Sequence, residues 1–199
     1  MSAVLLLSGG IESSVLLAMQ AHGTAPLFMD YAQRAAAREY AAAKAQSTQH
    51  GLELRRLDLS GVGDSVRAAQ EYKQHVPLPH RNLVALAVAL SYASALGVRR
   101  LLLALNREDG QAYPSASPGF IRAFASMAAK LGDFSLETPI AHLSKAQIIA
   151  MGRDLNVNFS QTWSCLLGYS LPCHRCNQCR NRAAAFVAAG IVDPLTPGG

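Results

Sequence analysis

Short apolar runs alternate with longer segments of helical periodicity along most of the chain. The apolar runs predict extended segments at Ala3–Leu7, Pro26–Asp30, Glu53–Leu59, Arg99–Leu105 and Phe134–Pro139. The segments with helical periodicity are Ile11–Ala21, Arg34–His50, Arg81–Leu96, Phe120–Leu131 and Lys145–Leu155. Strands that alternate with helices indicate an α/β fold, with a twisted parallel sheet covered by helices on both faces.

The helix expected at Arg81–Leu96 is apolar on nearly all sides. Its few polar positions include Ser91, Tyr92 and Ser94. A helix of this kind lies either in the core or at a contact between subunits. The pattern leaves both interpretations open.

Ligands of open parallel sheets bind beyond the carboxyl ends of the strands, so the segments after the strands are the expected site. These segments are Ser8–Ser13, Asp30–Arg34 and Asn106–Tyr113. The first is a glycine-rich turn between a strand and a helix, where backbone N–H groups and serine hydroxyls can hold a phosphate. Its spacing is neither that of a Walker loop nor G-x-G-x-x-G. By itself it equally fits a tight turn before a capped helix.

Composition and charge narrow the class of protein. The chain has 199 residues, half of them apolar, which suits one compact domain with a substantial core. Its net charge is +5, and Asp154 is the only acidic residue between Ile140 and Arg182. That bias suits a nucleotide, a nucleic acid or a solvated basic surface. Glu12 interrupts the first apolar run, and no apolar stretch reaches the ~20 residues of a membrane span, so we expect a cytoplasmic protein without membrane contact.

Four cysteines lie close together near the C-terminal end. Cys165, Cys173, Cys176 and Cys179 have the spacing C-x7-C-x2-C-x2-C. Four thiolates form the complete ligand set of a structural zinc site, and disulfides are rare in the cytosol. An iron–sulfur cluster and a redox C-x-x-C are the rival interpretations. We expect a small zinc knot in residues 161–199, packed on an ATP-binding domain of residues 1–160.

Several further motifs occur between the glycine-rich turn and the cysteines. They are D-Y-x-Q-R at Asp30–Arg34, V-P at Val76–Pro77, R-N at Arg81–Asn82, Tyr113-Pro114, L-S-K at Leu143–Lys145, T-W-S-C at Thr162–Cys165 and P-C-x-R-C-x-x-C-R at Pro172–Arg180. The turn resembles the S-G-G-x-D-S signature of the N-type ATP pyrophosphatase (PP-loop) superfamily. The order of all the motifs, over nearly the whole chain, resembles the 7-cyano-7-deazaguanine synthase (QueC) family of queuosine biosynthesis.

This resemblance implies an adenine nucleotide alpha hydrolase-like fold and a zinc-bearing homodimer. It also implies an ATP-dependent ligase that adenylates 7-carboxy-7-deazaguanine, forms an amide with ammonia and dehydrates it to the nitrile, releasing AMP and pyrophosphate. Mg²⁺ is expected to bridge the phosphates. The implied catalytic residues are Lys145, Arg81 and Glu12. The implied ATP contacts are Ser8, Gly9, Gly10, Ser13, Ser14, Asp30, Tyr31, Gln33 and Arg34. The implied acceptor contacts are Asn82, Asp109, Tyr113, Ser115 and Trp163, and the four cysteines hold zinc.

The chain departs from the family pattern at three positions. Glu12 and Ser115 stand where the family usually has Asp, and His80 stands where it has Gly, whereas Asp109 is retained. The Asp replaced by Ser115 looks suited to the base of the acceptor, so a member with an altered acceptor is a second hypothesis. Such a protein would modify nucleic acid or protein with a deazaguanine in a bacterial defence operon. A third is a zinc-ribbon nucleic-acid-binding protein on a degenerate nucleotide domain.

Overall fold

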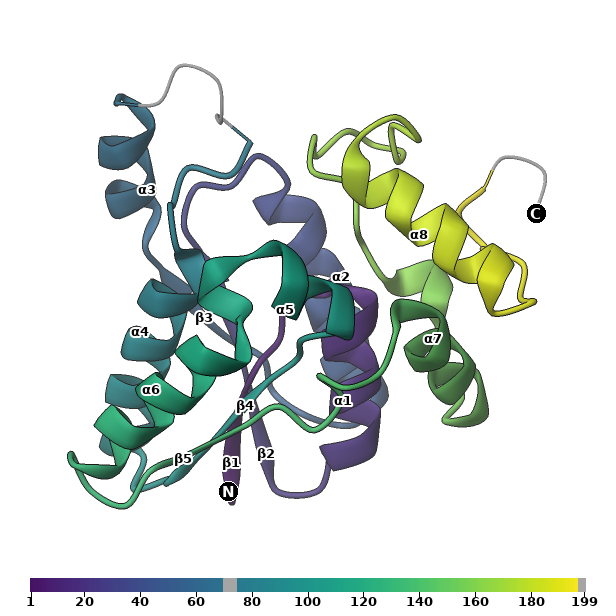
Figure 1. The fold of residues 1–199 in the computed structure, drawn as a ribbon. Coiled ribbons are helices and arrows are strands. Elements are labelled where there is room, and N and C mark those ends of the chain that lie inside the picture. The colour runs from purple at the N-terminus through teal and green to yellow at the C-terminus, as the bar shows by residue number, and fades with distance from the viewer. Residues whose placement is uncertain (70–74, 197–199) are drawn as a thin grey trace.

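The fold is built on a five-stranded sheet, which a computed structural model describes within residues 1–69 and 75–196. The strands are β1 (Ala3–Leu6), β2 (Thr24–Asp30), β3 (Arg55–Asp58), β4 (Arg100–Leu103) and β5 (Ser135–Glu137). They lie in the order β3-β2-β1-β4-β5, and every neighbouring pair is parallel (Figure 1). The prediction of a parallel sheet is confirmed.

Helices connect the strands and cover the sheet. They are α1 (Ile11–Gln20), α2 (Ala36–Gln49), α3 (Ser60–Arg67), α4 (Arg81–Ala95), α5 (Arg107–Ala112), α6 (Pro118–Ala129), α7 (Lys145–Asp154) and α8 (Asn177–Ala188), with 3-10 turns η1 (Pro114–Ala116) and η2 (Phe159–Gln161). In Figure 1, α4 and α6 lie on one side of the sheet, and α1, α2, α7 and α8 lie on the other. None of the helices in the described ranges is long and apolar enough to cross a membrane.

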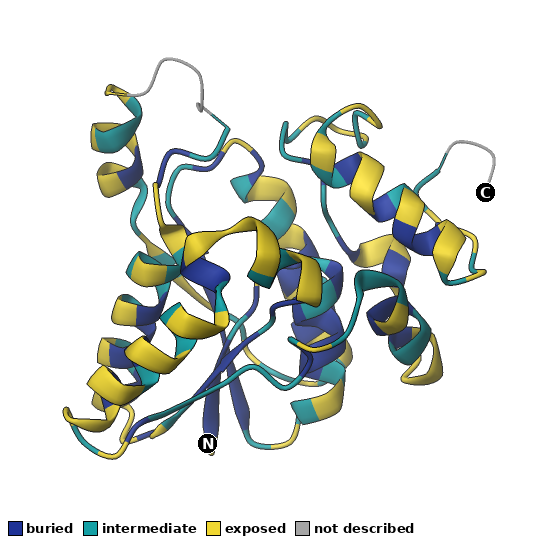
Figure 2. Cartoon of the chain, in the orientation of Figure 1, coloured by how far each residue is buried: buried dark blue, intermediate teal, exposed yellow. Residues whose placement is uncertain are grey.

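Strand β1 shows why both faces of the sheet are covered. Leu5 belongs to a hydrophobic cluster with Val15 of α1 and Phe186 of α8. Val4, the residue before it, belongs to a second cluster with Leu86 of α4. Successive strand residues point to opposite faces, so an uninterrupted apolar strand needs an apolar partner on each side. Figure 2 shows the same layering, with buried strands inside and exposed helix surfaces outside.

Helix α4 is buried on one face only. Leu86, Ala89, Leu90 and Ala93 pack toward the sheet, whereas Leu83 is 46% exposed. The core interpretation of this apolar helix is therefore confirmed for the inner face. The subunit contact remains a prediction for the outer one.

The structure differs from the sequence prediction in three elements. Strand β3 is largely exposed, and not an apolar buried strand, because it forms the edge of the sheet and its residues are mostly charged. The connection after it, for which the sequence predicts no element, contains α3, in which an ideal Cβ on Gly63 would lie 1.8 Å from the Tyr31 carbonyl oxygen. Helix α8 begins directly within the cysteine segment, where Cys176 caps it by accepting the Cys179 N–H.

A buried ion pair joins α8 to the last described residues of the chain. Two nitrogens of Arg182 donate to the two oxygens of Asp193 at 2.8 and 2.9 Å, and both residues are buried. Arg182 also donates to Thr162 Oγ1 at 2.8 Å and to the Phe159 carbonyl at 3.0 Å. Residues 161–196 therefore share one packed core with the preceding chain, while residues 197–199 of the expected zinc segment lie outside the described residues.

Removal of Asp193 should destabilise the protein strongly, because it leaves the Arg182 guanidinium buried without its counter-charge. We expect Asp193→Ala to lower the free energy of unfolding by about 3–5 kcal/mol, measured by urea denaturation. Asp154→Ala, which removes the exposed Arg153–Asp154 pair, is the matched control and should cost less than about 1 kcal/mol. Equal effects of the two substitutions would contradict the interpretation.

Candidate functional site

The candidate site lies at the carboxyl edge of the sheet, between β1 and β4. These neighbouring strands lead to opposite sides, since β1 is followed by α1 and then β2, and β4 by α5, α6 and then β5 (Figure 1). A parallel sheet opens a crevice at such a switch point, and this is where its ligands bind. The starts of α1, α5 and α7 meet there.

The glycine-rich turn after β1 is clamped on both sides. Gly9 has a left-handed φ of 77°, and an ideal Cβ there would lie 2.4 Å from the Glu39 carbonyl oxygen of α2. The Gly9 carbonyl accepts the Trp163 N–H at 2.8 Å. Gly10 is extended and begins α1, so the first N–H groups of that helix have no intrahelical acceptor. Such a turn offers backbone donors to an anion.

The serines of the turn differ in exposure. Ser8 is exposed, and its hydroxyl lies 3.1 Å from that of Ser13. Ser13 is 3% exposed, and Ser14 is fully buried. The hydroxyls of Ser14 and Ser13 both donate to the Gly10 carbonyl, at 2.8 and 3.2 Å, and close the first turn of α1, while that of Ser13 also lies beside the exposed Ser8.

A nearly buried ion pair joins α1 to α7. Lys145 Nζ lies 2.7 Å from Glu12 Oε1, and both side chains are 14% exposed. Asn106 Nδ2 donates to the same oxygen at 2.8 Å. Burial alone raises the pKa of Glu12, but the Lys145 ammonium outweighs it and holds the pKa below its ordinary value. Burial likewise lowers the pKa of Lys145, and Glu12 more than reverses this, so both groups are charged.

The second oxygen of Glu12 remains available to the phosphate loop. Oε2 lies 3.9 Å from the position of an ideal Cβ on Gly10, and Ser8 Oγ lies 3.3 Å from the same point. The side chains of Asn106 and Lys145 both bind Oε1 and leave Oε2 open. A carboxylate oxygen beside an anion-binding turn is the kind of ligand that a hard divalent cation prefers.

The expected acceptor residues gather on the other side of the crevice. The Arg81 guanidinium lies 5.7 Å from the centre of the Tyr113 ring, and Asn82 Nδ2 donates to the Ser115 carbonyl at 3.0 Å. Asp109 Oδ2 accepts the Asn106 N–H in the capping box of α5. Burial raises the pKa of Asp109, and the nearby Glu12 carboxylate raises it further.

His80 precedes this group in a left-handed conformation. Its φ is 49° and its ψ is 39°, which a glycine adopts more readily than a histidine. The backbone at the start of α4 therefore keeps the shape of a glycine position, although this chain has His there.

The segment after β2 forms the wall beside the turn. Asp30 Oδ2 lies 2.6 Å from Arg56 Nη2. Gln33 is buried, accepts the Tyr31 N–H at 2.9 Å and donates to Glu39 Oε2 at 2.9 Å. Burial raises the pKa of both Tyr31 and Glu39.

The sequence reasoning missed Glu39 and Asn106 as individual site residues. Asn106 directly follows the predicted strand 99–105, inside a segment already expected to bind ligand, so its position was a usable signal. Glu39 lies within α2, and no sequence pattern places its carboxylate beside Gln33.

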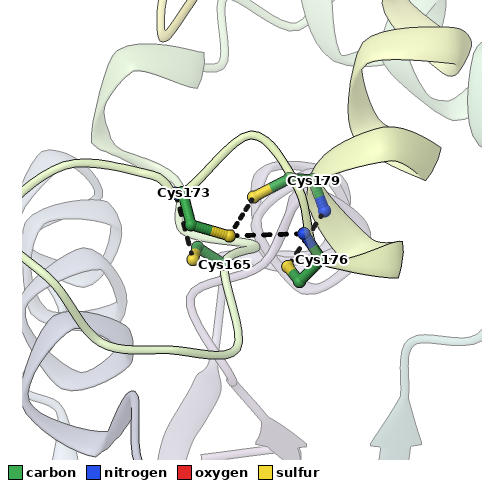
Figure 3. A group of neighbouring side chains, drawn as sticks. All are labelled: Cys165, Cys173, Cys176 and Cys179. Carbon is green, nitrogen blue, oxygen red and sulfur yellow. Dashed lines mark hydrogen bonds between the residues drawn. The ribbon is translucent and has the colours of Figure 1, made fainter.

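The four cysteine sulfurs converge on one point, as Figure 3 shows. All of them lie within 4.8 Å of one another, and Cys173 Sγ and Cys179 Sγ are 3.9 Å apart. Backbone N–H groups of Cys173, Cys176 and Cys179 donate to sulfurs of the group. Burial opposes ionisation of Cys173, but N–H donors of Arg175 and Cys176 lower its pKa to about 6. The group can hold a metal ion.

The cysteine segment packs against the start of α2. An ideal Cβ on Gly168 would lie 2.2 Å from the Arg34 carbonyl oxygen. The Arg34 guanidinium lies 5.5 Å from the centre of the Tyr169 ring, and that of Arg38 lies 5.9 Å from the Trp163 ring. Trp163 Nε1 also donates to the Cys165 carbonyl at 2.8 Å. The metal-binding group is thereby connected to the phosphate loop through Trp163.

The sheet order and the glycine-rich turn at its switch point define an α/β protein of the adenine nucleotide alpha hydrolase-like (PP-loop) class. Two solved structures share this fold. One is NH3-dependent NAD synthetase from Campylobacter jejuni, with a TM-score of 0.56 and 18% identity, covering 80% of this chain and 66% of that one. The other is U34-tRNA thiolase NcsA from Methanococcus maripaludis, with its [4Fe-4S] cluster, which has a TM-score of 0.57 and 11% identity and covers 96% of this chain and 65% of that one.

The chain belongs to the family described as Queuosine biosynthesis protein QueC, whose profile matches residues 2–190. It is 38% identical over 216 residues to the 7-cyano-7-deazaguanine synthase of Thiobacillus denitrificans, covering 96% of both chains. It is 37% identical over 215 residues to the enzyme of that name from Pseudomonas fluorescens, covering 96% of this chain and 94% of the other. The resemblance inferred from the motifs is confirmed.

The close approach of α2 to the turn predicts a strong effect of a methyl group at Gly9. Gly51 is the matched control, because its φ is also positive, at 66°, but a Cβ there would meet nothing within 4 Å. We expect Gly51→Ala to cost about 1–2 kcal/mol of stability through its conformation alone. Gly9→Ala should cost about 1–3 kcal/mol more, because it also forces α2 away. Equal unfolding free energies of the two variants would contradict the close packing of α2 against Gly9.

Proposed function

We propose that this chain is an ATP-dependent 7-cyano-7-deazaguanine synthase, which converts 7-carboxy-7-deazaguanine and ammonia to the nitrile. The observation that carries this proposal is the joint position of the Ser8–Ser13 turn and the Lys145 ammonium at the switch point of the sheet, in a member of the QueC family. The altered-acceptor and nucleic-acid-binding hypotheses have no comparable support.

The carboxylate substrate is a poor electrophile, so the enzyme must first activate it. Adenylation converts the carboxylate to a mixed anhydride and releases pyrophosphate, and ammonia then displaces AMP to give the amide. A second adenylation, at the amide oxygen, allows loss of AMP and of two N–H protons to give the nitrile. Each adenylation develops negative charge on departing pyrophosphate, which preorganised donors and cations stabilise.

The ATP side of the crevice is assigned to the turn and to the segment after β2. Ser8, Gly9, Gly10 and Ser13 would bind the pyrophosphate, with Ser14 supporting the turn from within α1. Lys145 and Arg81 would supply positive charge to the phosphates and the activated carboxylate. The segment Asp30–Arg34, including Tyr31 and Gln33, would lie beside the nucleoside.

Mg²⁺ fits the same edge of the site. Glu12 Oε2 would hold the ion, because Oε1 is already committed to Lys145 and Asn106. When bound, Mg²⁺ neutralises charge on the ATP phosphates. The longer side chain of Glu12, compared with the Asp of the superfamily, reaches both partners while it stays beside the turn.

The acceptor is assigned to the side of the crevice formed by α4, α5 and η1. Asn82, Asp109, Tyr113 and Ser115 would contact the deazaguanine, and Trp163 would border it from the cysteine segment. Asp109 has a free oxygen for a donor of the base, which would compensate for Ser115 in place of an Asp.

The bound metal of the cysteine group is proposed to be zinc. A zinc ion at about 2.3 Å from four tetrahedral sulfurs places these about 3.8 Å apart. The observed 3.9 Å between Cys173 and Cys179 fits that arrangement. Four protein ligands leave no position for water, so zinc would hold the segment in place and take no part in the reaction.

The remaining proposals concern location and assembly. We place the enzyme in the cytoplasm, as a homodimer. The exposed outer face of α4 is the surface we assign to the second copy, together with Met127 of α6 and Leu131 just after α6, which are 41% and 65% exposed.

The reaction itself is the direct test of this function. The protein with ATP, Mg²⁺, ammonia and 7-carboxy-7-deazaguanine should form AMP and a product lighter by the difference between a carboxyl and a nitrile group, by mass spectrometry. Lys145→Met should lower the rate about 10²–10³-fold, as expected for loss of one group that stabilises the developing charge. Formation of ADP, or AMP formation that does not depend on the acid, would contradict the proposal.

Metal analysis tests the cysteine site. We expect one zinc ion per chain, and we expect Cys173→Ser to lose the metal and lower the melting temperature, because metal binding energy is folding energy here. His174→Ala, next to Cys173 but with no sulfur, should keep the zinc. Iron with visible absorption in the purified protein, or a fully folded metal-free protein, would overturn the assignment.

A further inference from the structure

Asn106 lies between the loop after β4 and the phosphate loop after β1. Asn106 is only 4% exposed, and the proposed reaction assigns it no role. Oδ1 accepts the Asp109 N–H at 2.7 Å, and Nδ2 donates to Glu12 Oε1 at 2.8 Å. The two ends of one carboxamide therefore bind two different loops at the switch point.

The cap of α5 fixes the direction of this carboxamide. Because Oδ1 is held by the Asp109 N–H, Nδ2 is the only end that can face Glu12. Helix α5 is itself held against α7, since Glu108 Oε2 accepts the Lys145 N–H at 3.2 Å and the Arg107 N–H donates to the Leu143 carbonyl at 2.9 Å. The donor thus reaches Glu12 from a fixed support.

The hydrogen bond from Asn106 determines which groups each carboxylate oxygen of Glu12 contacts. Oε1 receives both Asn106 and Lys145, at 2.8 and 2.7 Å. Oε2 is then the oxygen nearer to Gly10. Without the Asn106 donor, the carboxylate is free to rotate and present both oxygens to Lys145, which would draw the ammonium away from the phosphate loop.

We propose that Asn106 is a positioning residue, which orients the Glu12 carboxylate and through it the Lys145 ammonium toward the bound phosphates. This inference rests on the proposed function for its effect on the reaction. It gives Asn106 a second role besides capping α5, namely to orient the Glu12 side chain.

Asn106→Asp keeps the cap of α5 and removes the hydrogen bond to Glu12. Asp caps helices as well as Asn does, so the bond from the Asp109 N–H is kept, while the donor to Glu12 is replaced by an acceptor. We expect kcat for AMP formation to fall about 10- to 100-fold, with KM for ATP changed less than about threefold, because the Lys145 ammonium acts mainly on the charge that develops on departing pyrophosphate.

Two further variants serve as controls. Asn158→Asp makes the same change at a distant cap, where Asn158 Oδ1 accepts the Ser160 N–H at 3.1 Å, and it should leave the rate unchanged. Asn106→Ser also retains a capping oxygen but removes the donor without adding charge. It should lower kcat to a similar extent, and it provides the test if Asn106→Asp does not fold.

Binding of magnesium pyrophosphate, measured by calorimetry, tests the inference separately from the proposed reaction. Asn106→Asp and Asn106→Ser should weaken it about tenfold relative to both the wild type and Asn158→Asp, even if the wild type does not use 7-carboxy-7-deazaguanine. If kcat and pyrophosphate affinity of both Asn106 variants stay within about threefold of the wild type, the positioning role is wrong.

Discussion

The ion pair between Glu12 and Lys145 is the interaction on which the geometry of the site depends. It joins the first turn of α1 to the first turn of α7, at the point where β1 and β4 lead to opposite faces of the sheet. A buried pair of charges is tolerated only when its remaining bonding capacity is satisfied, and Asn106 contributes to this from α5. Two elements far apart in sequence are thereby held around one crevice.

The phosphate loop is fixed from the other side by backbone contacts. Helix α2 approaches Gly9 so closely that only a glycine fits, and the Trp163 N–H binds the Gly9 carbonyl. Trp163 precedes the first cysteine of the metal-binding group, whose loop also packs on Arg34. Energy released by metal binding would therefore order the wall of the nucleotide site. Donors that are already in place cost no reorganisation during the reaction.

Much of this arrangement could be predicted from the sequence, where a local pattern has a single structural meaning. Uninterrupted apolar strands such as Ala3–Leu6 require a sheet buried on both faces, and the spacing of four cysteines indicates a metal site. Helix α3 escaped prediction because its glycine-rich segment carries no clear local signal. The strand predicted at Glu53–Leu59 is present as β3, but its exposure was not predicted, because it depends on the place of β3 at the edge of the sheet beside β2. Asn106 escaped because its partner, Glu12, is set by the sheet order and not by a local pattern.

The most direct test of the account follows the oxygen atoms of the substrate. The protein is given 7-carboxy-7-deazaguanine with isotopically labelled carboxylate oxygens, ATP and ammonia, and AMP is analysed by mass spectrometry. If the carboxylate and then the amide are adenylated, each nitrile formed releases two AMP molecules, and each AMP carries one labelled oxygen. Label that appears in water or in inorganic phosphate, with none in AMP, would contradict the central claim that the crevice between β1 and β4 transfers adenylate to the acid.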